Sequence, residues 1–214
     1  MRTRRAFTRL ILWGALGGSL LVDGLTSRTR RLWAAARKVV AKGTPRASLI
    51  SEDPATLDTT HLELTRLDAF DTMGTTDRVV DLGTWRLEVA GLVKRPLTMT
   101  FAQVAALPSI DREVLLICPG VFVNHGRWKG VSMRGVLKDA EYDRTASRVV
   151  IEAKGDKSAD FPIADVLSGQ VFLAYQVNGT TLPGKHGFPL RVVAEGYYGA
   201  EWVKYVDTIR VARA

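Results

Sequence analysis

The chain has 214 residues and a mass of 23.5 kDa, about one domain by length, and its 46% hydrophobic and 24% charged residues exclude collagen, coiled coils and wholesale disorder. One cysteine excludes an intrachain disulfide framework and a zinc site of several cysteines, and three histidines leave few nitrogen ligands for any metal. The net charge of +8 does not indicate nucleic-acid binding, because residues 1–46 hold eleven basic side chains and one acidic one, whereas residues 47–214 hold 19 basic and 21 acidic ones.

The N-terminal segment has the pattern of an export signal. A basic head precedes thirteen uncharged residues, 10–22, which span about 20 Å as a helix and fall short of a ~30 Å hydrocarbon core. The pair Arg4 and Arg5 resembles the twin-arginine motif of proteins that are exported folded, often around a cofactor. A basic amphipathic tail on a membrane surface is the alternative. We expect residues 1–36 to be an export signal or an uncleaved anchor, which places the protein in the periplasm or facing it.

The rest of the chain divides into a linker and a folded domain. Residues 37–60 are polar and interrupted by Pro45 and Pro54, which predicts a linker. The domain is expected to cover residues 61–214.

Within the domain, strands outnumber helices, and the helices are short. Thr100 with Gln103 forms a capping box before a helix over 101–106, and Ser132 caps a second helix through residue 137. Asn178 and Gly179 predict a two-residue hairpin. These features favour a mixed, β-rich α+β domain over a doubly wound sheet. Alternating or continuous apolar residues predict strands at 85–90, 114–117, 149–151, 171–177, 190–193 and 206–211.

Three segments carry residues suited to chemistry. Cys118 ends a buried apolar strand, where a thiol serves as a soft metal ligand, a nucleophile or inert filler. His186 and Arg191 flank an irregular loop rich in glycine and proline, and such cations suit an anion such as a phosphate. A third segment contains Gly199, Ala200 and Lys204, whose small residues allow a close approach of backbone to a ligand. Solvated cations and core aromatics are the alternatives for the last two segments.

These segments, in this order, resemble the molybdopterin-binding domain of the sulfite oxidase family. The resemblance runs from about Leu64 to Val211. It implies the mixed, β-rich fold of that family and a molybdenum-molybdopterin cofactor, which carries the redox chemistry while the protein positions it. The matching segments are 84–97, 116–118, 128–137, 174–191 and 199–205.

The resemblance also implies roles for individual residues. The thiolate of Cys118 would ligate molybdenum, which accepts a soft sulfur ligand. The cofactor's phosphate and pterin would be met by the remaining matched positions: His186, Arg191, Gly199, Ala200 and Lys204.

The departures from the family matter equally. Around residues 70–74 the family often has an arginine and a histidine, and neither is present here. We expect no haem domain before the core and no second β-sandwich after it, and because members of the resembled family that dimerise do so through that sandwich, we expect a monomer.

The function implied is an exported oxidoreductase that moves an oxygen atom to or from a small sulfur or other oxo compound, including protein methionine sulfoxide. Its electrons would pass to a haem membrane protein or a c-type cytochrome. An S-oxide reductase is favoured, because the sulfite dianion calls for several arginines near the metal and the sequence offers few candidates there, with Arg127 the nearest in sequence to Cys118. The alternatives are a sulfite dehydrogenase that reduces a cytochrome and a non-catalytic binding module that keeps the fold.

Arg127 and His125 are the predicted catalytic residues. Arg127 lies nine residues after Cys118, in a segment expected to fold back over the metal as a loop, where its guanidinium and the neighbouring imidazole would meet the substrate. A solvated loop arginine is the alternative.

Overall fold

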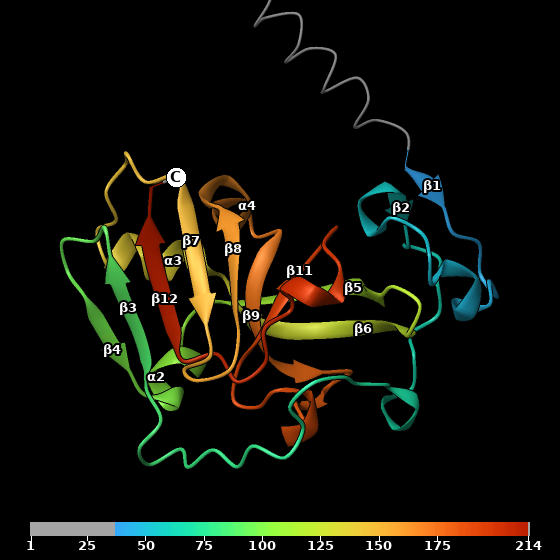
Figure 1. Ribbon diagram of the computed structural model, residues 1–214, viewed down its shortest axis with the longest axis horizontal. Coiled ribbons are helices and arrows are strands. Elements are labelled where there is room, and N and C mark those ends of the chain that lie inside the picture. The colour runs from blue at the N-terminus through green and yellow to red at the C-terminus, as the bar shows by residue number, and fades with distance from the viewer. Residues whose placement is uncertain (1–36, 214) are drawn as a thin grey trace, which may run out of the picture. The chain divides into compact units, whose positions relative to one another are not determined.

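Two five-stranded sheets and short helices make up residues 37–213, the part of the chain that the computed structural model describes (Figure 1). The sheets and short helices confirm the predicted β-rich α+β class. The predicted export signal or anchor, residues 1–36, lies outside the described residues. Within 37–213, no helix is long and apolar enough to cross a membrane.

The first sheet is built on a long antiparallel hairpin, and it carries the predicted metal ligand. Ser109 pairs with Val131 at one end of this hairpin, and Cys118 pairs with Phe122 at the other. Asn178 and Gly179 both have positive φ, 49° and 79°, as the predicted two-residue turn requires. In spatial order the strands are β10 (Thr180–Thr181), β9 (Val171–Val177), β6 (Phe122–Val131) and β5 (Ser109–Cys118), with β11 (Arg191–Ala194) also paired to β9.

The second sheet is mixed, because its central strand β12 runs parallel to β3 and antiparallel to β7. In Figure 1 its strands stand side by side, and the β5–β6 hairpin runs crosswise to them. Trp85, Leu87 and Val89 are buried, as the alternating pattern predicts. In spatial order the strands are β4 (Leu97–Met99), β3 (Leu87–Gly91), β12 (Thr208–Ala212), β7 (Arg148–Glu152) and β8 (Ser158–Pro162).

The helices are short, and local signals set where two of them begin. Thr100 and Gln103 form the predicted reciprocal capping box at the start of α2. The Ser132 hydroxyl accepts a hydrogen bond from the amide of Arg134 and caps α3. The helices are α2 (Phe101–Ala105), α3 (Met133–Asp139) and α4 (Ile163–Ser168), and the 3₁₀ turns are η1 (Arg46–Leu49), η2 (Pro54–Thr56), η3 (Leu67–Ala69), η4 (Gly184–His186) and η5 (Gly199–Glu201).

Residues 37–60 are folded, in contrast to the predicted linker. β1 (Lys38–Val39) pairs in parallel with β2 (Leu57–Asp58), and this segment packs on one face of the β5–β6 hairpin. The segment is polar and contains two prolines, and its few apolar residues are spaced too widely to show the periodicity of a helix or a strand. Nothing in the sequence therefore indicates that they are buried. Its buried members are Val40, Leu49, Leu57 and Leu62, which pack on Leu115, Ile117 and Val123.

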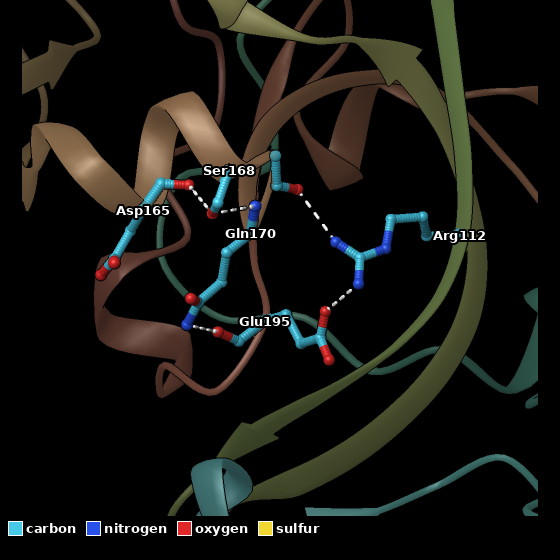
Figure 2. A network of polar contacts seen from close by, with 6 residues as sticks. Arg112, Asp165, Ser168, Gln170 and Glu195 are labelled. Carbon is cyan, nitrogen blue, oxygen red and sulfur yellow. Dashed lines mark hydrogen bonds and ion pairs between the residues drawn. The ribbon is translucent and has the colours of Figure 1, made fainter. Parts of the chain in front are cut away.

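A polar network ties the first sheet to the chain that leads from β11 into η5 (Figure 2). Arg112 of β5 pairs with the carboxylate of Glu195 and donates to the carbonyl of Gly169 at 3.0 Å. The Gln170 side chain donates to the carbonyl of Glu195 at 2.8 Å, and the amide of Glu195 donates back to the carbonyl of Gln170 at 3.0 Å. The network anchors the segment just before Gly199 and Ala200.

Candidate functional site

Cys118 is presented by the alternation of strand β5. Val114, Leu116 and Cys118 share one face of the strand and contact the main core, whereas Leu115 and Ile117 face the 37–62 segment. After Cys118 the chain turns through Gly120, whose φ is 72°, and the amide of Val121 donates to the carbonyl of Cys118 at 2.9 Å. The thiol is therefore held at a strand end, and Cys118 is 7% exposed.

The thiol opens into a cavity of about 410 Å³. Its walls come from segments far apart in the sequence, and four of the predicted cofactor residues besides Cys118 line it. The lining residues with functional interest are Asp71 to Thr75, Leu116, Cys118, Val121, Asp156, Lys157, Arg191, Gly199, Ala200, Trp202 and Lys204.

Gly199 packs closely beside Cys118. A Cβ added there would lie 3.2 Å from Leu116 Cδ1, 3.4 Å from the carbonyl oxygen of Ile117 and 3.5 Å from Cys118 Cβ. A side chain at 199 would therefore contact strand β5 and require the Leu116 side chain to shift slightly. The backbone of η5 forms the wall of the cavity at this point.

Arg191 is a buried cation with an incomplete set of partners. Its Nη1 donates to the carbonyl of His186 at 3.0 Å, but its buried Nε has no partner. The guanidinium carbon lies 5.2 Å from the ring of Trp128 and 5.5 Å from the ring of Trp202, and the two indoles also contact each other edge to face at 5.5 Å, so the guanidinium packs against a pair of indoles. Burial lowers the pKa of Arg191 to about 10, which still leaves the side chain charged at neutral pH. A buried charge of this kind calls for an anion.

Lys204 is the second cation of the cavity. Its ammonium donates to the hydroxyl of Thr72 at 3.2 Å, to the carbonyl of Lys185 at 3.2 Å and to the carbonyl of Thr75. These bonds fasten the irregular 71–75 segment over the cavity. Burial, followed by the nearby charge of Arg191, lowers the pKa of Lys204 to about 8.

His186 lies beneath these two cations and does not line the cavity. It is 1% exposed, and its buried Nε2 has no hydrogen-bond partner. Burial, and then the charges of Arg191, Lys185 and Lys204, lower its pKa to about 4, so the imidazole is neutral at pH 7. His186 thus contacts the predicted anion-binding residue Arg191 through its backbone carbonyl, which accepts a hydrogen bond from the guanidinium.

The two predicted catalytic residues lie elsewhere. Residues 122–131 form strand β6 in place of the expected loop, because Gly120 allows a tight turn directly after Cys118. Arg127 pairs with Glu113, five residues or about 17 Å along the strand from Cys118, and its Nε donates to Asp111 at 3.0 Å. His125 pairs with Leu115, on the face opposite the thiol, and its Nδ1 lies 3.4 Å from the carbonyl of Glu63. Neither residue lines the cavity.

Three features of the cavity were not predicted from the sequence. Lys157, in the turn between β7 and β8, reaches the cavity, and its charge acts on the Cys118 thiol. The 71–75 segment forms a wall, although it lacks the family's arginine and histidine. Trp128 and Trp202 both contact Arg191, although they are 74 positions apart in the sequence. No local sequence pattern predicts a contact over that separation.

The chemistry of the donor set fits a cofactor that brings its own metal ligands. Among residues 37–213, no group of three or more His, Cys, Asp and Glu side chains is placed to hold a metal ion. A metal bound through Cys118 would take one soft ligand from the described residues and its other ligands from a non-protein group. The unpartnered Nε of Arg191, beside Lys204 in the same cavity, fits an anionic part of that group.

Comparisons with known proteins agree with this chemistry. The family model described as "Oxidoreductase molybdopterin binding domain" matches residues 73–214. The chain is 32% identical over 168 residues to a nitrate reductase [NADH] of Petunia hybrida, which covers 59% of this chain and 18% of that protein. It is 30% identical over 137 residues to "Putative protein-methionine-sulfoxide reductase subunit YedZ1" of Azospira oryzae, covering 64% of this chain and 52% of that protein.

Among solved structures, the sulfane dehydrogenase SoxCD of Paracoccus pantotrophus shares the fold with a TM-score of 0.60 and 23% identity, over 64% of this chain and 40% of that one. The chain thus spans about half or less of the length of these proteins. The family model, in contrast, matches residues 73–214, which is more than half of this chain. The chain belongs to the oxidoreductase molybdopterin-binding domain family.

Proposed function

We propose that this chain is an exported molybdenum-pterin oxidoreductase that reduces an S-oxide. The observation that carries the proposal is the convergence of Cys118, Arg191 and Lys204 on one cavity. In the overall reaction, a sulfoxide takes up two electrons and two protons and yields a thioether and water. A haem membrane protein or a c-type cytochrome would supply the electrons.

The chain's own residues hold and orient the cofactor. Cys118 supplies a thiolate to the metal, and because burial raises the pKa of the free thiol, binding is expected to release a proton. Arg191 and Lys204 would meet the phosphate, with the indoles of Trp128 and Trp202 restricting the guanidinium. When bound, the molybdenum-pterin group supplies oxygen-atom and electron transfer.

The cavity near Cys118 suits a neutral or weakly polar substrate. Met73 and Val121 line it and are 57% and 54% exposed, so apolar side chains stand at its mouth. Asp71 and Asp156 also line it, and with Arg191 and Lys204 assigned to the phosphate, Lys157 is the one cation left among the described lining residues to face a substrate, which disfavours a dianion such as sulfite. Lys157 is exposed, has no ion partner among the described residues, and is available to donate a hydrogen bond to an S-oxide oxygen.

The test is turnover of the cofactor-loaded protein with dithionite-reduced benzyl viologen as donor. Free and protein-bound methionine sulfoxide should be reduced, and sulfite with ferricyanide as acceptor should give less than about one tenth of that kcat/KM. Faster sulfite oxidation would favour the sulfite dehydrogenase. A protein that carries molybdenum yet turns over neither substrate would favour the non-catalytic module.

Arg127→Met is expected to leave kcat/KM and molybdenum content within about twofold of the parent, because an exposed ion pair with Asp111 contributes only about 0–1 kcal/mol. Steady-state kinetics with the S-oxide check this. A tenfold rise in KM would return Arg127 to the substrate site.

Cofactor retention should depend on pH through Lys204. Its folded-state pKa of about 8 lies below its ordinary value of 10.5, so the ammonium that holds an anion is lost as pH rises past about 8. Conversely, the cofactor-free fold should gain stability from this group between about pH 8 and 10.5, where the unfolded chain binds more protons. Lys204→Arg, which stays charged, should lose the pH dependence of retention, measured as pterin left after dialysis at pH 7 and pH 9. Identical pH profiles in the two proteins would remove Lys204 from the anion site.

The N-terminal segment is proposed to be a receptor-read export address. Arg4→Lys with Arg5→Lys keeps the charge but changes the paired-arginine motif, so folded protein should accumulate in the cytoplasm. Cell fractionation measures this. Undiminished export of the lysine variant would favour a membrane-surface helix instead.

A further inference from the structure

A wide hollow of the described domain lies apart from the cofactor cavity. It is a groove of about 1020 Å³, and it shares no lining residue with the cavity that holds Cys118. The end of β3, helix α3 and its following turn, and α4 contribute its walls. The lining residues, called here the β3–α3 groove, are Gly91, Leu92, Val93, Lys94, Arg134, Lys138, Glu141, Tyr142, Asp143, Arg144 and Leu167.

The floor of the β3–α3 groove is preformed and apolar. Val93 and Tyr142 form an antiparallel bridge, and the amide of Asp143 donates to the carbonyl of Leu92 at 2.9 Å. The amide of Lys94 donates to the carbonyl of Glu141 at 3.1 Å, so both edges of the floor are hydrogen-bonded. Leu92, Val93, Tyr142 and Leu167 are partly buried and pack on the main core.

Four cations surround this floor: Lys94, Arg134, Lys138 and Arg144. All four are exposed, and none makes an ion pair with a described residue. The two acidic residues of the groove are already paired with arginines outside it, Glu141 with Arg95 at 3.3 Å and Asp143 with Arg213 at 3.5 Å. The groove therefore presents a net positive rim.

The same pattern marks the cofactor cavity. There too, cations without an acidic partner among residues 37–213 face a hollow: Lys157, Arg191 and Lys204. Other cations, such as Lys129, also make none of the ion pairs found among the described residues, so the distinguishing feature of the groove is that four of them gather around one apolar floor.

We propose that the β3–α3 groove docks an acidic segment of a partner protein. Exposed cations gain little from one small anion in salt, because water and counterions screen each contact. Several carboxylates acting together, with an apolar side chain on the floor, match both the charge and the apolar centre of the groove. An apolar centre with a charged rim is the usual anatomy of a protein interface. The proposal stands independently of the S-oxide reductase activity.

The probe is a fluorescein-labelled acidic peptide, acetyl-Glu-Glu-Leu-Asp-Phe-Glu-Asp-amide, titrated with the full chain and followed by fluorescence anisotropy. We expect binding at 50 mM salt that weakens at 200 mM salt. Lys138→Glu with Arg144→Glu should weaken it at least tenfold. Lys138→Gln with Arg144→Gln should weaken it about three- to tenfold, and serves if the reversed pair fails to fold.

The matched control is Lys42→Glu with Arg46→Glu. It removes the same two residue types and changes the net charge equally, but both positions lie in the 37–60 segment, outside the groove. Its peptide affinity should stay within twofold of the parent. Equal losses in the two pairs would show diffuse attraction, and no loss in the groove pairs would place the peptide elsewhere. Tighter, groove-dependent binding of a labelled 12-nucleotide single strand would replace the acidic protein with nucleic acid. Each of these three results overturns the proposal.

Discussion

Cys118→Ser is expected to give a folded protein without S-oxide turnover. Serine nearly matches the size of cysteine, and residue 118 sits at a strand end, packed against Gly199, so the fold should tolerate the change. The soft thiolate, however, is replaced by a hard hydroxyl that is a poor ligand for a metal already bound by sulfur. The loss should exceed a hundredfold in kcat, with an altered metal absorption spectrum.

The control for this variant is the stability of the cofactor-free protein, measured for the parent and for Cys118→Ser. Thermal unfolding of the cofactor-free forms should differ by only about 1–2 kcal/mol, the usual range for a conservative change at a buried position. Cys118 is the sole cysteine of the chain, so no other thiol is available to replace it. Turnover equal to that of the parent would remove Cys118 from the metal.

Arg191→Met is expected to lower cofactor content while leaving the cofactor-free fold as stable as before, or more stable. Removing a charge-assisted contact with a buried anion costs about 1.5–3 kcal/mol, which corresponds to about ten- to hundredfold in occupancy when cofactor is limiting. In the empty fold, by contrast, the guanidinium is buried with an unpartnered Nε, and burial lowers its pKa to about 10. Methionine fills the space beside the two indoles without that desolvation cost.

Arg191→Lys separates charge from shape. A lysine keeps the positive charge but lacks the planar guanidinium that packs against the rings of Trp128 and Trp202. Its pterin content should fall between those of the parent and the methionine variant. The measurement is pterin fluorescence after oxidation, per mole of folded chain. Equal pterin content in all three proteins would contradict the role of Arg191.

The fold was predictable where local signals act. The capping box at Thr100, the cap at Ser132 and the Asn178–Gly179 turn all depend on residues within a few positions of one another. Strand β6 was missed because residues 122–131 alternate poorly: both faces of its first half are buried, one by the main core and one by the 37–62 segment. Because the 37–62 segment packs on this face of the hairpin, residues 37–60 are part of the fold and not the expected linker.

The candidate site divides in the same way. Cys118, Arg191, Gly199, Ala200 and Lys204 were found because each lies in a short segment that resembles the family, and the structure gathers them at one cavity. Arg127 and His125 were chosen for nearness in sequence to Cys118. In an antiparallel hairpin, each residue after the turn lies farther from the turn along the partner strand, so Arg127 lies far from Cys118. Side chains also alternate between the two faces of a strand, and His125 is on the face opposite the thiol. Lys157 reaches the cavity from a turn that has no distinguishing pattern.

The most direct test of the account is the metal and pterin content of the full chain purified from a host that makes the molybdenum cofactor. The account predicts about one molybdenum and one pterin per chain, both reduced in Arg191→Met, with the metal spectrum changed in Cys118→Ser. A well-folded parent protein that contains neither molybdenum nor pterin under these conditions would contradict it.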